Sequence, residues 1–228
     1  MKRTANLIIQ HLLWRGLYFF SILILNILIA RFFAAEKSGQ IFYITNNLAF
    51  LMLLVSMSLE SGAVYFISSG KADAVQMGRF FLIWALIAGF AATAGWWFGL
   101  KFTGSSFFGK SKIIVAGILF ITGVLLTTFF NALFYSKQQF GLPNRILFGV
   151  NAILIIVLIL ENQLSWIREN FLLIYFSCFF FQGLLLMIIF FVWYPEKRIK
   201  GIPSSPILKK VFRYSAIALI TNIIYFIL

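Results

Sequence analysis

The sequence predicts an all-α integral membrane protein with six complete transmembrane helices and the start of a seventh. Hydrophobic residues make up 62% of the 228 residues and charged residues only 11%, whereas soluble domains average about 45–50% and about 25%. The apolar residues also gather in runs of roughly twenty, the length of helix that crosses about 30 Å of hydrocarbon. Such a chain would expose large apolar surfaces in water, so lipid is its expected solvent.

Each predicted span is an apolar run bounded by polar or charged residues. The six complete spans are 12–34, 41–67, 80–100, 113–135, 146–160 and 171–193. The first run carries Arg15 near its start and is longer than the apolar part of a signal peptide, so we interpret it as an uncleaved span. A further apolar run begins near Val211 and continues to Leu228.

This pattern divides the chain into three predicted parts. Residues 1–193 are predicted to form a six-helix lobe, residues 194–213 a basic cytoplasmic linker, and residues 214–228 the start of a second lobe. Proline interrupts helices, and the linker holds three prolines and six basic residues: Pro195, Pro203, Pro206, Lys197, Arg198, Lys200, Lys209, Lys210 and Arg213. Because the last apolar run reaches Leu228 without a polar tail, we expect this chain to be one lobe of a longer two-lobe protein.

The distribution of positive charge predicts that the N-terminus is cytoplasmic. With that orientation the cytoplasmic segments carry twelve Lys and Arg and the outer segments five, leaving aside Arg15 and Arg31 within the first span. An excess of Lys and Arg in cytoplasmic loops is the usual determinant of membrane topology. It also accounts for the net charge of +13, so nucleic acid is not an expected partner.

Catalytic and metal chemistry has few residues to draw on. The chain has a single cysteine, a single histidine and a single aspartate, which are Cys178, His11 and Asp73. An intrachain disulfide is therefore excluded, and a zinc site or a Ser-His-Asp triad lacks convergent ligands or partners. We expect no enzyme activity, no catalytic residues, no metal and no cofactor.

One sequence motif matches a nucleotide-binding pattern without its context. Residues 104–111 (GSSFFGKS) fit the phosphate-binding loop GxxxxGK[ST]. That loop requires a strand before it and a helix after it, whereas here both flanks are predicted spans and the loop is predicted to face outward. We therefore do not expect ATP binding.

A pair of glycines has the spacing that permits a close contact between helices. Gly95 and Gly99 are four residues apart in the third predicted span. Small residues at this spacing allow two transmembrane helices to approach closely. The pair is adequate for such a contact, and we attach no further function to it.

Charged residues within the predicted spans are the candidate functional residues, because they are costly in lipid and tend to mark function. Arg15 lies near the cytoplasmic start of the first span, Arg31 at its outer end, and Glu60 about 10 Å from the cytoplasmic end of the second. Consecutive spans are usually neighbours, so Arg15 and Glu60 are expected to meet. With Asn26 they form the predicted substrate-binding set.

Structural roles for the same residues stay open. Arg15 can extend to lipid headgroups, and Glu60 can simply neutralise it or stay protonated. Arg31 fits an interfacial anchor, and buried asparagines often only join neighbouring helices.

Several short segments together resemble a transporter family. They are NILIARFF (26–33), SGQIF (38–42), SLESGA (58–63), FYSKQQF (134–140) and RYS (213–215). They are similar to segments of Wzx-type polysaccharide repeat-unit flippases, which belong to one superfamily with the multidrug and toxin extrusion transporters. A glycine usual in the first loop of that family is replaced around Ala34 and Ala35.

The resemblance implies twelve to fourteen helices in two lobes that work by alternating access in the bacterial inner membrane. The implied function is the flipping of undecaprenyl-diphosphate-linked oligosaccharides for surface polysaccharide, including O-antigen of lipopolysaccharide, with other assembly proteins as partners. Arg15 would then engage the diphosphate. A cation-coupled multidrug exporter with Glu60 as its ion-responsive group, a membrane-embedded polysaccharide polymerase and a non-transporting assembly subunit remain alternatives. A polymerase of this kind usually has a large outer loop, whereas the outer loops predicted here (35–40, 101–112, 161–170) are short, which argues against it.

Overall fold

The computed structural model describes residues 2–102, 111–160, 165–195 and 201–227. This part of the chain is 90% helical and holds no strand. Its helices are α1 (Lys2–Phe32), α2 (Ala35–Ser56), α3 (Leu59–Ser68), α4 (Ala74–Phe102), α5 (Ser111–Ser136), α6 (Gly141–Leu160), α7 (Ser165–Trp193) and α8 (Ser205–Ile227). The all-α class predicted from the sequence is confirmed.

Six of the described helices are long and apolar enough to cross a membrane. These segments are Leu12–Phe32, Ala35–Ser56, Ala74–Gly99, Ile113–Ser136, Gly141–Leu160 and Glu169–Trp193. Large apolar side chains point outward on them, as shown by Leu12, Ile87 and Val192, which are 62%, 64% and 68% exposed. Apolar surface of this extent is stable against lipid, so the chain is a multi-pass membrane protein.

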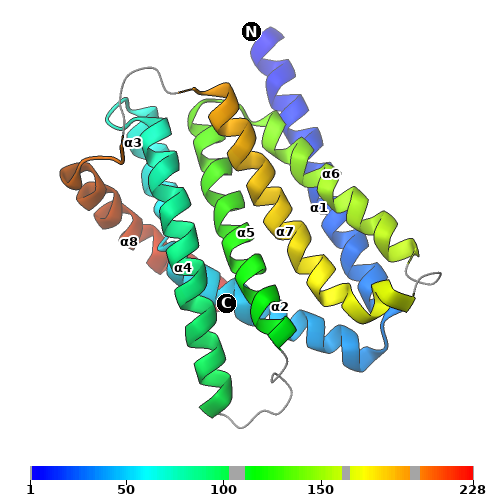
Figure 1. The fold of residues 1–228 in the computed structure, drawn as a ribbon. Coiled ribbons are helices and arrows are strands. Elements are labelled where there is room, and N and C mark those ends of the chain that lie inside the picture. Colours follow the sequence, from blue (N-terminus) through cyan, green and yellow to red (C-terminus); the bar gives the residue numbers. More distant parts are fainter. Residues whose placement is uncertain (1, 103–110, 161–164, 196–200, 228) are drawn as a thin grey trace.

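Helix α5 lies at the centre of the bundle (Figure 1). It packs most extensively against α7 and also contacts α2, α3 and α4, while α1 pairs with α6. Aromatic side chains fill the centre: Phe81 stacks on Phe129 with ring centroids 4.2 Å apart, and Phe190 meets Phe130 and Phe134 edge-on. The start of the chain, the α3–α4 and α5–α6 turns and the end of α7 lie at one end of the bundle, here called the N-terminal end.

Helices α5 and α7 approach each other closely, backbone to backbone, at Gly123 and Gly183. A Cβ atom added to Gly123 would lie 2.5 Å from the Cα atom of Phe180, and one added to Gly183 would lie 2.5 Å from the carbonyl oxygen of Gly123. At Gly95 and Gly99 an added Cβ meets nothing within 4 Å. Among the described residues, no helix packs against the faces of Gly95 and Gly99, so this pair makes no close helix contact.

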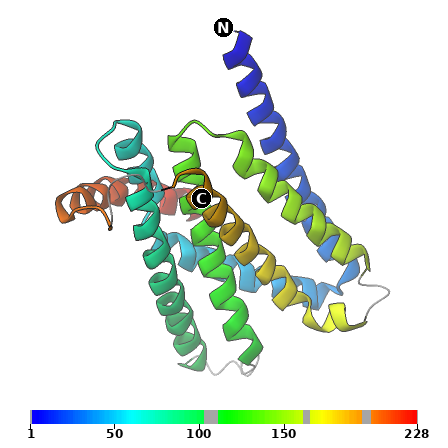
Figure 2. The same ribbon diagram turned by 45° about the horizontal axis from the view of Figure 1, so that its top comes forward.

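The second predicted span, 41–67, is not one continuous helix. Helix α2 lies across the direction of the central helices (Figure 2), and Met57 and Ser58 adopt left-handed φ angles of 51° and 50° between α2 and α3. Such angles are unfavourable for residues other than glycine. Nearby polar groups compensate: the Trp84 indole donates to the Val55 carbonyl at 2.9 Å, and Asn222 donates to the Ser58 hydroxyl at 2.9 Å.

The last helix begins earlier than predicted. Helix α8 starts at Ser205, inside the segment 194–213 that we expected to be linker. Pro206 stands in its first turn, where its missing N–H is not needed. The helix packs on α3 and α2, and Tyr214 stacks on Tyr65 at 5.0 Å.

Candidate functional site

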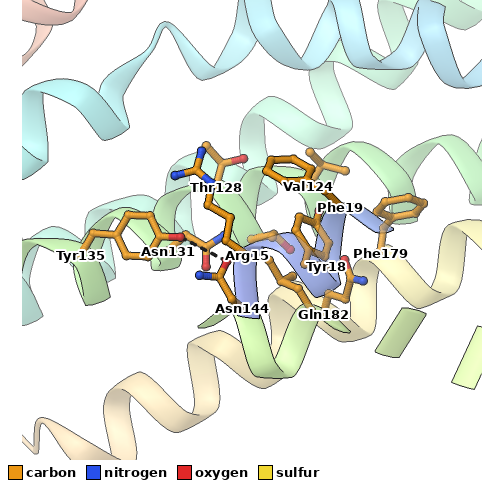
Figure 3. Close-up of a pocket in the computed structure, with 12 residues that line it drawn as sticks. Arg15, Tyr18, Phe19, Val124, Thr128, Asn131, Tyr135, Asn144, Phe179 and Gln182 are labelled. Carbon is orange, nitrogen blue, oxygen red and sulfur yellow. Dashed lines mark hydrogen bonds between the residues drawn. The ribbon is translucent and has the colours of Figure 1, made fainter. Parts of the chain in front are cut away.

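A cavity of about 250 Å³ lies between the α1–α6 pair and the α5–α7 pair (Figure 3). It is formed by the middle of α1 and of α7, the second half of α5 and the first turns of α6. The α5 and α6 residues place it toward the N-terminal end. Its lining residues are Arg15, Tyr18, Phe19, Val124, Thr127, Thr128, Asn131, Tyr135, Asn144, Leu147, Phe179 and Gln182. We take it as the candidate functional site.

Each helix presents one face to the cavity. On α5, the residues Val124, Thr127, Thr128, Asn131 and Tyr135 follow helical spacing of three and four residues. Apart from Val124, these residues form a polar stripe on a helix whose other positions are mostly apolar. It directs hydroxyl and amide groups toward the space opposite α1.

Arg15 is the cationic member of the lining, and none of the lining residues is acidic. Its side chain is exposed, and its guanidinium carbon lies 5.6 Å from the centre of the Phe19 ring, within the range of a cation–π contact. An arginine among neutral polar groups favours an anionic ligand, because its guanidinium binds phosphate or carboxylate through charge-assisted hydrogen bonds.

A buried chain of hydrogen bonds extends from the cavity wall. Gln182 donates to Asn151 Oδ1 at 2.9 Å, and Asn151 donates to the hydroxyl of Ser21 at 2.9 Å. Ser21 in turn donates to the carbonyl of Tyr18 at 2.6 Å. The three side chains are at most 4% exposed, so this chain fixes α7, α6 and α1 relative to one another beside the cavity.

Other polar groups of the wall differ in how they are bonded. Asn144 donates to the Phe140 carbonyl at 3.0 Å and accepts from the Tyr135 hydroxyl at 3.4 Å (Figure 3). The side-chain oxygens of Thr127 and Asn131 are covered and have no hydrogen-bond partner. Unpartnered buried oxygens are uncommon and costly, so these two residues hold hydrogen-bonding capacity that the folded chain does not use.

Of the four predicted site residues, the cavity contains only Arg15. Glu60 lies in the first turn of α3, and its Oε2 atom is covered without a hydrogen-bond partner. The expected meeting of Arg15 and Glu60 is therefore not made, because α1 packs on α6 whereas α3 packs on α5 and α8. Arg31 stands in the last turn of α1, and both Arg31 and Asn26 are exposed and outside the lining.

Sequence reasoning missed most of the wall. The charge of Arg15 made it a candidate from the sequence alone. The other polar residues of the wall are neutral and have no comparable sequence signal; they are Thr127, Asn131, Tyr135, Asn144 and Gln182. The spacing of the polar residues on α5 could have indicated one shared face. Helix packing, however, decides which neighbouring helices contact that face of α5. Residues 104–110 of the phosphate-loop pattern lie outside the described residues.

Comparison with known proteins gives no family assignment. No family model, curated protein or solved structure matches this chain. The cavity and the residues around it are therefore the basis for a proposed function.

Proposed function

We propose that this chain is part of a membrane transporter that moves an anionic lipid-linked oligosaccharide across the bilayer, with Arg15 binding the phosphate groups next to the lipid. The observation that carries the proposal is the position of Arg15 in a cavity lined otherwise by neutral polar and aromatic residues. A charge inside a membrane protein is retained chiefly where a ligand or pathway uses it.

The size of the cavity indicates which part of the substrate it would hold. Small-molecule pockets usually measure about 300–1,000 Å³, and this cavity measures about 250 Å³. It has room for a charged headgroup and not for a whole oligosaccharide, so the sugars would extend beyond this lobe. A two-lobe arrangement in which a second half faces this cavity fits that requirement and is part of the proposal.

The lining also bears on the alternative of a cation-coupled drug exporter. A site for cationic drugs needs acidic or electron-rich groups, and the lining of this cavity contains no Asp or Glu. The flippase class, which the sequence motifs also resemble, is therefore the better proposal. The bacterial inner membrane and partnership with other polysaccharide-assembly proteins belong to the same proposal.

The test is complementation of a gene deletion with variants of the full-length protein. The deletion strain should accumulate lipid-linked repeat units that face the cytoplasm. Arg15→Ala should restore export at least tenfold less well than wild type, because charge-assisted hydrogen bonds contribute about 1.5–3 kcal/mol and each 1.4 kcal/mol is a factor of ten. Arg15→Lys should restore export in part, since it keeps the charge and loses the bidentate geometry.

Arg31→Ala is the matched control, because Arg31 is an exposed arginine on the same helix and outside the cavity. It should complement as wild type does, with protein levels checked by immunoblot. Normal surface polysaccharide in the deletion strain would refute the proposed substrate. Equal effects of Arg15→Ala and Arg31→Ala would refute the role of the cavity.

A further inference from the structure

The outward face of α8 changes from cationic to apolar along its length, and none of its residues lines the cavity. Lys209, Lys210 and Arg213 are exposed on the first turns of this helix. Ile217 and Ile220 follow on the same face at helical spacing, and each is more than half exposed. The first turns of α8 form the outer edge of the bundle in both views (Figure 1 and Figure 2).

The opposite face of α8 is occupied by protein. Val211 and Ser215 are fully buried, and both lie against Gly62 of α3. A Cβ atom added to Gly62 would lie 2.5 Å from the Ser215 hydroxyl oxygen and 2.9 Å from the Val211 carbonyl oxygen. Phe212 packs on Trp84 of α4 with ring centroids 5.5 Å apart. These contacts fix the rotation of α8, so the cations and the isoleucines face outward together.

A stacked pair of tyrosines lies beside these cations. Tyr65, near the end of α3, and Tyr214 of α8 have ring centroids 5.0 Å apart and an interplanar angle of 6°. The ammonium group of Lys71, in the α3–α4 turn, lies 5.7 Å from the centre of the Tyr65 ring. Both tyrosines are exposed. Tyrosine is enriched where the hydrocarbon of a bilayer meets the headgroups, so this pair indicates the level of the headgroups.

The same surface has little negative charge of its own. The sequence of α8 contains no Asp or Glu. Asp73, in the α3–α4 turn, accepts hydrogen bonds from the amides of Val75 and Gln76 at 2.9 Å and so caps the start of α4. Glu60 stands at the other end of α3, in its first turn. The excess of positive charge therefore favours an anion from outside the protein.

The order of charged and apolar residues indicates the class of anion. Lys210 and Ile217 are separated by about 10 Å along the helix, at 1.5 Å per residue. A lipid in one leaflet is about 20 Å long, so one molecule can place its phosphate on the cations and its acyl chain on the isoleucines. A soluble anion would leave the isoleucines in water, which is unfavourable. Helices with this basic and apolar character typically bind anionic lipids.

We propose that the first half of α8 and the end of α3 form a binding surface for an anionic phospholipid of the bilayer, with Lys209, Lys210 and Arg213 holding its phosphate. Lys71 adds a positive charge from the α3 side, and the isoleucines contact an acyl chain. A lipid bound there stabilises the packing of α8 on α3. This lipid is not transported, so the proposal goes beyond the proposed function.

The test is native mass spectrometry of the full-length protein in detergent, titrated with anionic phosphatidylglycerol or with zwitterionic phosphatidylcholine. The wild type should bind phosphatidylglycerol at least tenfold more tightly, because each Lys or Arg near anionic lipid contributes about a factor of five. The combined substitution of Lys209→Gln, Lys210→Gln and Arg213→Gln should remove this preference. Phosphatidylcholine binding and the circular dichroism spectrum should stay unchanged.

A matched control removes the same charge elsewhere. The combined substitution of Arg31→Gln, Lys37→Gln and Lys137→Gln also takes three positive charges from exposed positions, and this variant should retain the preference. Arg15→Ala should retain it too, because Arg15 lines the cavity and not the surface of α8.

Four results would overturn the proposal. Equal binding of the two phospholipids by the wild type would indicate that a protein neighbour covers α8. Equal losses in the two triple variants would indicate an effect of net charge alone. Displacement of phosphatidylglycerol by millimolar inorganic phosphate would indicate a site for a soluble anion, and loss of the preference in Arg15→Ala would place the lipid in the cavity. If lipid-linked oligosaccharide is not transported but the α8 cations still determine lipid preference, the proposed function fails and the lipid surface stands.

Discussion

The contact between Gly123 and Gly183 makes a quantitative prediction about the stability of the bundle. In Gly123→Ala the new Cβ would lie 2.5 Å from the Cα atom of Phe180, whereas ordinary contact begins at 3.4 Å. The neighbouring atoms are backbone, so side-chain rotation cannot relieve the clash. The helices must separate locally by about 0.9 Å, the difference between these two distances.

The cost follows from this separation. Overpacking typically destabilises by about 1–3 kcal/mol, and gaps of about 0.5–1 Å forfeit a quarter to a half of the dispersion energy of each contact they open. Helices α5 and α7 share the most extensive interface of the described helices. We therefore expect a penalty of about 3 kcal/mol for Gly123→Ala, at the upper end of the overpacking range.

Gly149→Ala is the matched control. Gly149 lies in α6, and a Cβ atom added there meets nothing within 4 Å. Both substitutions gain the same helix propensity, about 1 kcal/mol in peptides, so the difference between the variants isolates the clash.

The assay is reversible unfolding of the purified protein in mixed micelles with increasing sodium dodecyl sulfate, followed by circular dichroism. Gly123→Ala should unfold at lower denaturant than wild type. Gly149→Ala should unfold at equal or higher denaturant. Coincident unfolding curves for the two variants would refute the close approach of α5 and α7.

Two further substitutions test polar contacts in the fold. Asn151→Leu removes the hydrogen bonds that link Gln182 to Ser21 and should destabilise the protein by about 1 kcal/mol, as found for hydrogen bonds between membrane helices. Asn26→Leu, at an exposed position on α1, should change stability little. Equal effects of the two substitutions would contradict this hydrogen-bonding pattern. Trp84→Phe keeps the ring and loses the donor to the Val55 carbonyl, so it should destabilise by about 1 kcal/mol and accelerate hydrogen exchange of amides near the α2–α3 break. Unchanged exchange there would show that Trp84 does not stabilise the break.

The sequence alone determined the class of this protein and most of its helices. Each span is encoded locally, because a helix that crosses lipid needs only enough consecutive apolar residues to match the hydrocarbon thickness. The same local logic identified Arg15, since a charged residue inside an apolar run is visible without knowing its neighbours. The predicted cytoplasmic N-terminus rests on loop charge, and it stays a prediction.

Only the tertiary structure decided which residues meet. Helical spacing placed Asn131 and Thr127 on one face of α5, but packing decided that this face meets Arg15 on α1 and Gln182 on α7. Packing likewise separated Arg15 from Glu60 and made Gly123, not Gly95, the point of close approach. The break at Ser58 has no local signal, because its strained backbone is compensated by Trp84 and Asn222 from distant helices. Contacts between helices depend on how each helix is rotated about its axis and on which helices surround it. In lipid the pattern of apolar residues specifies neither property, because every face of such a helix is apolar enough to contact lipid.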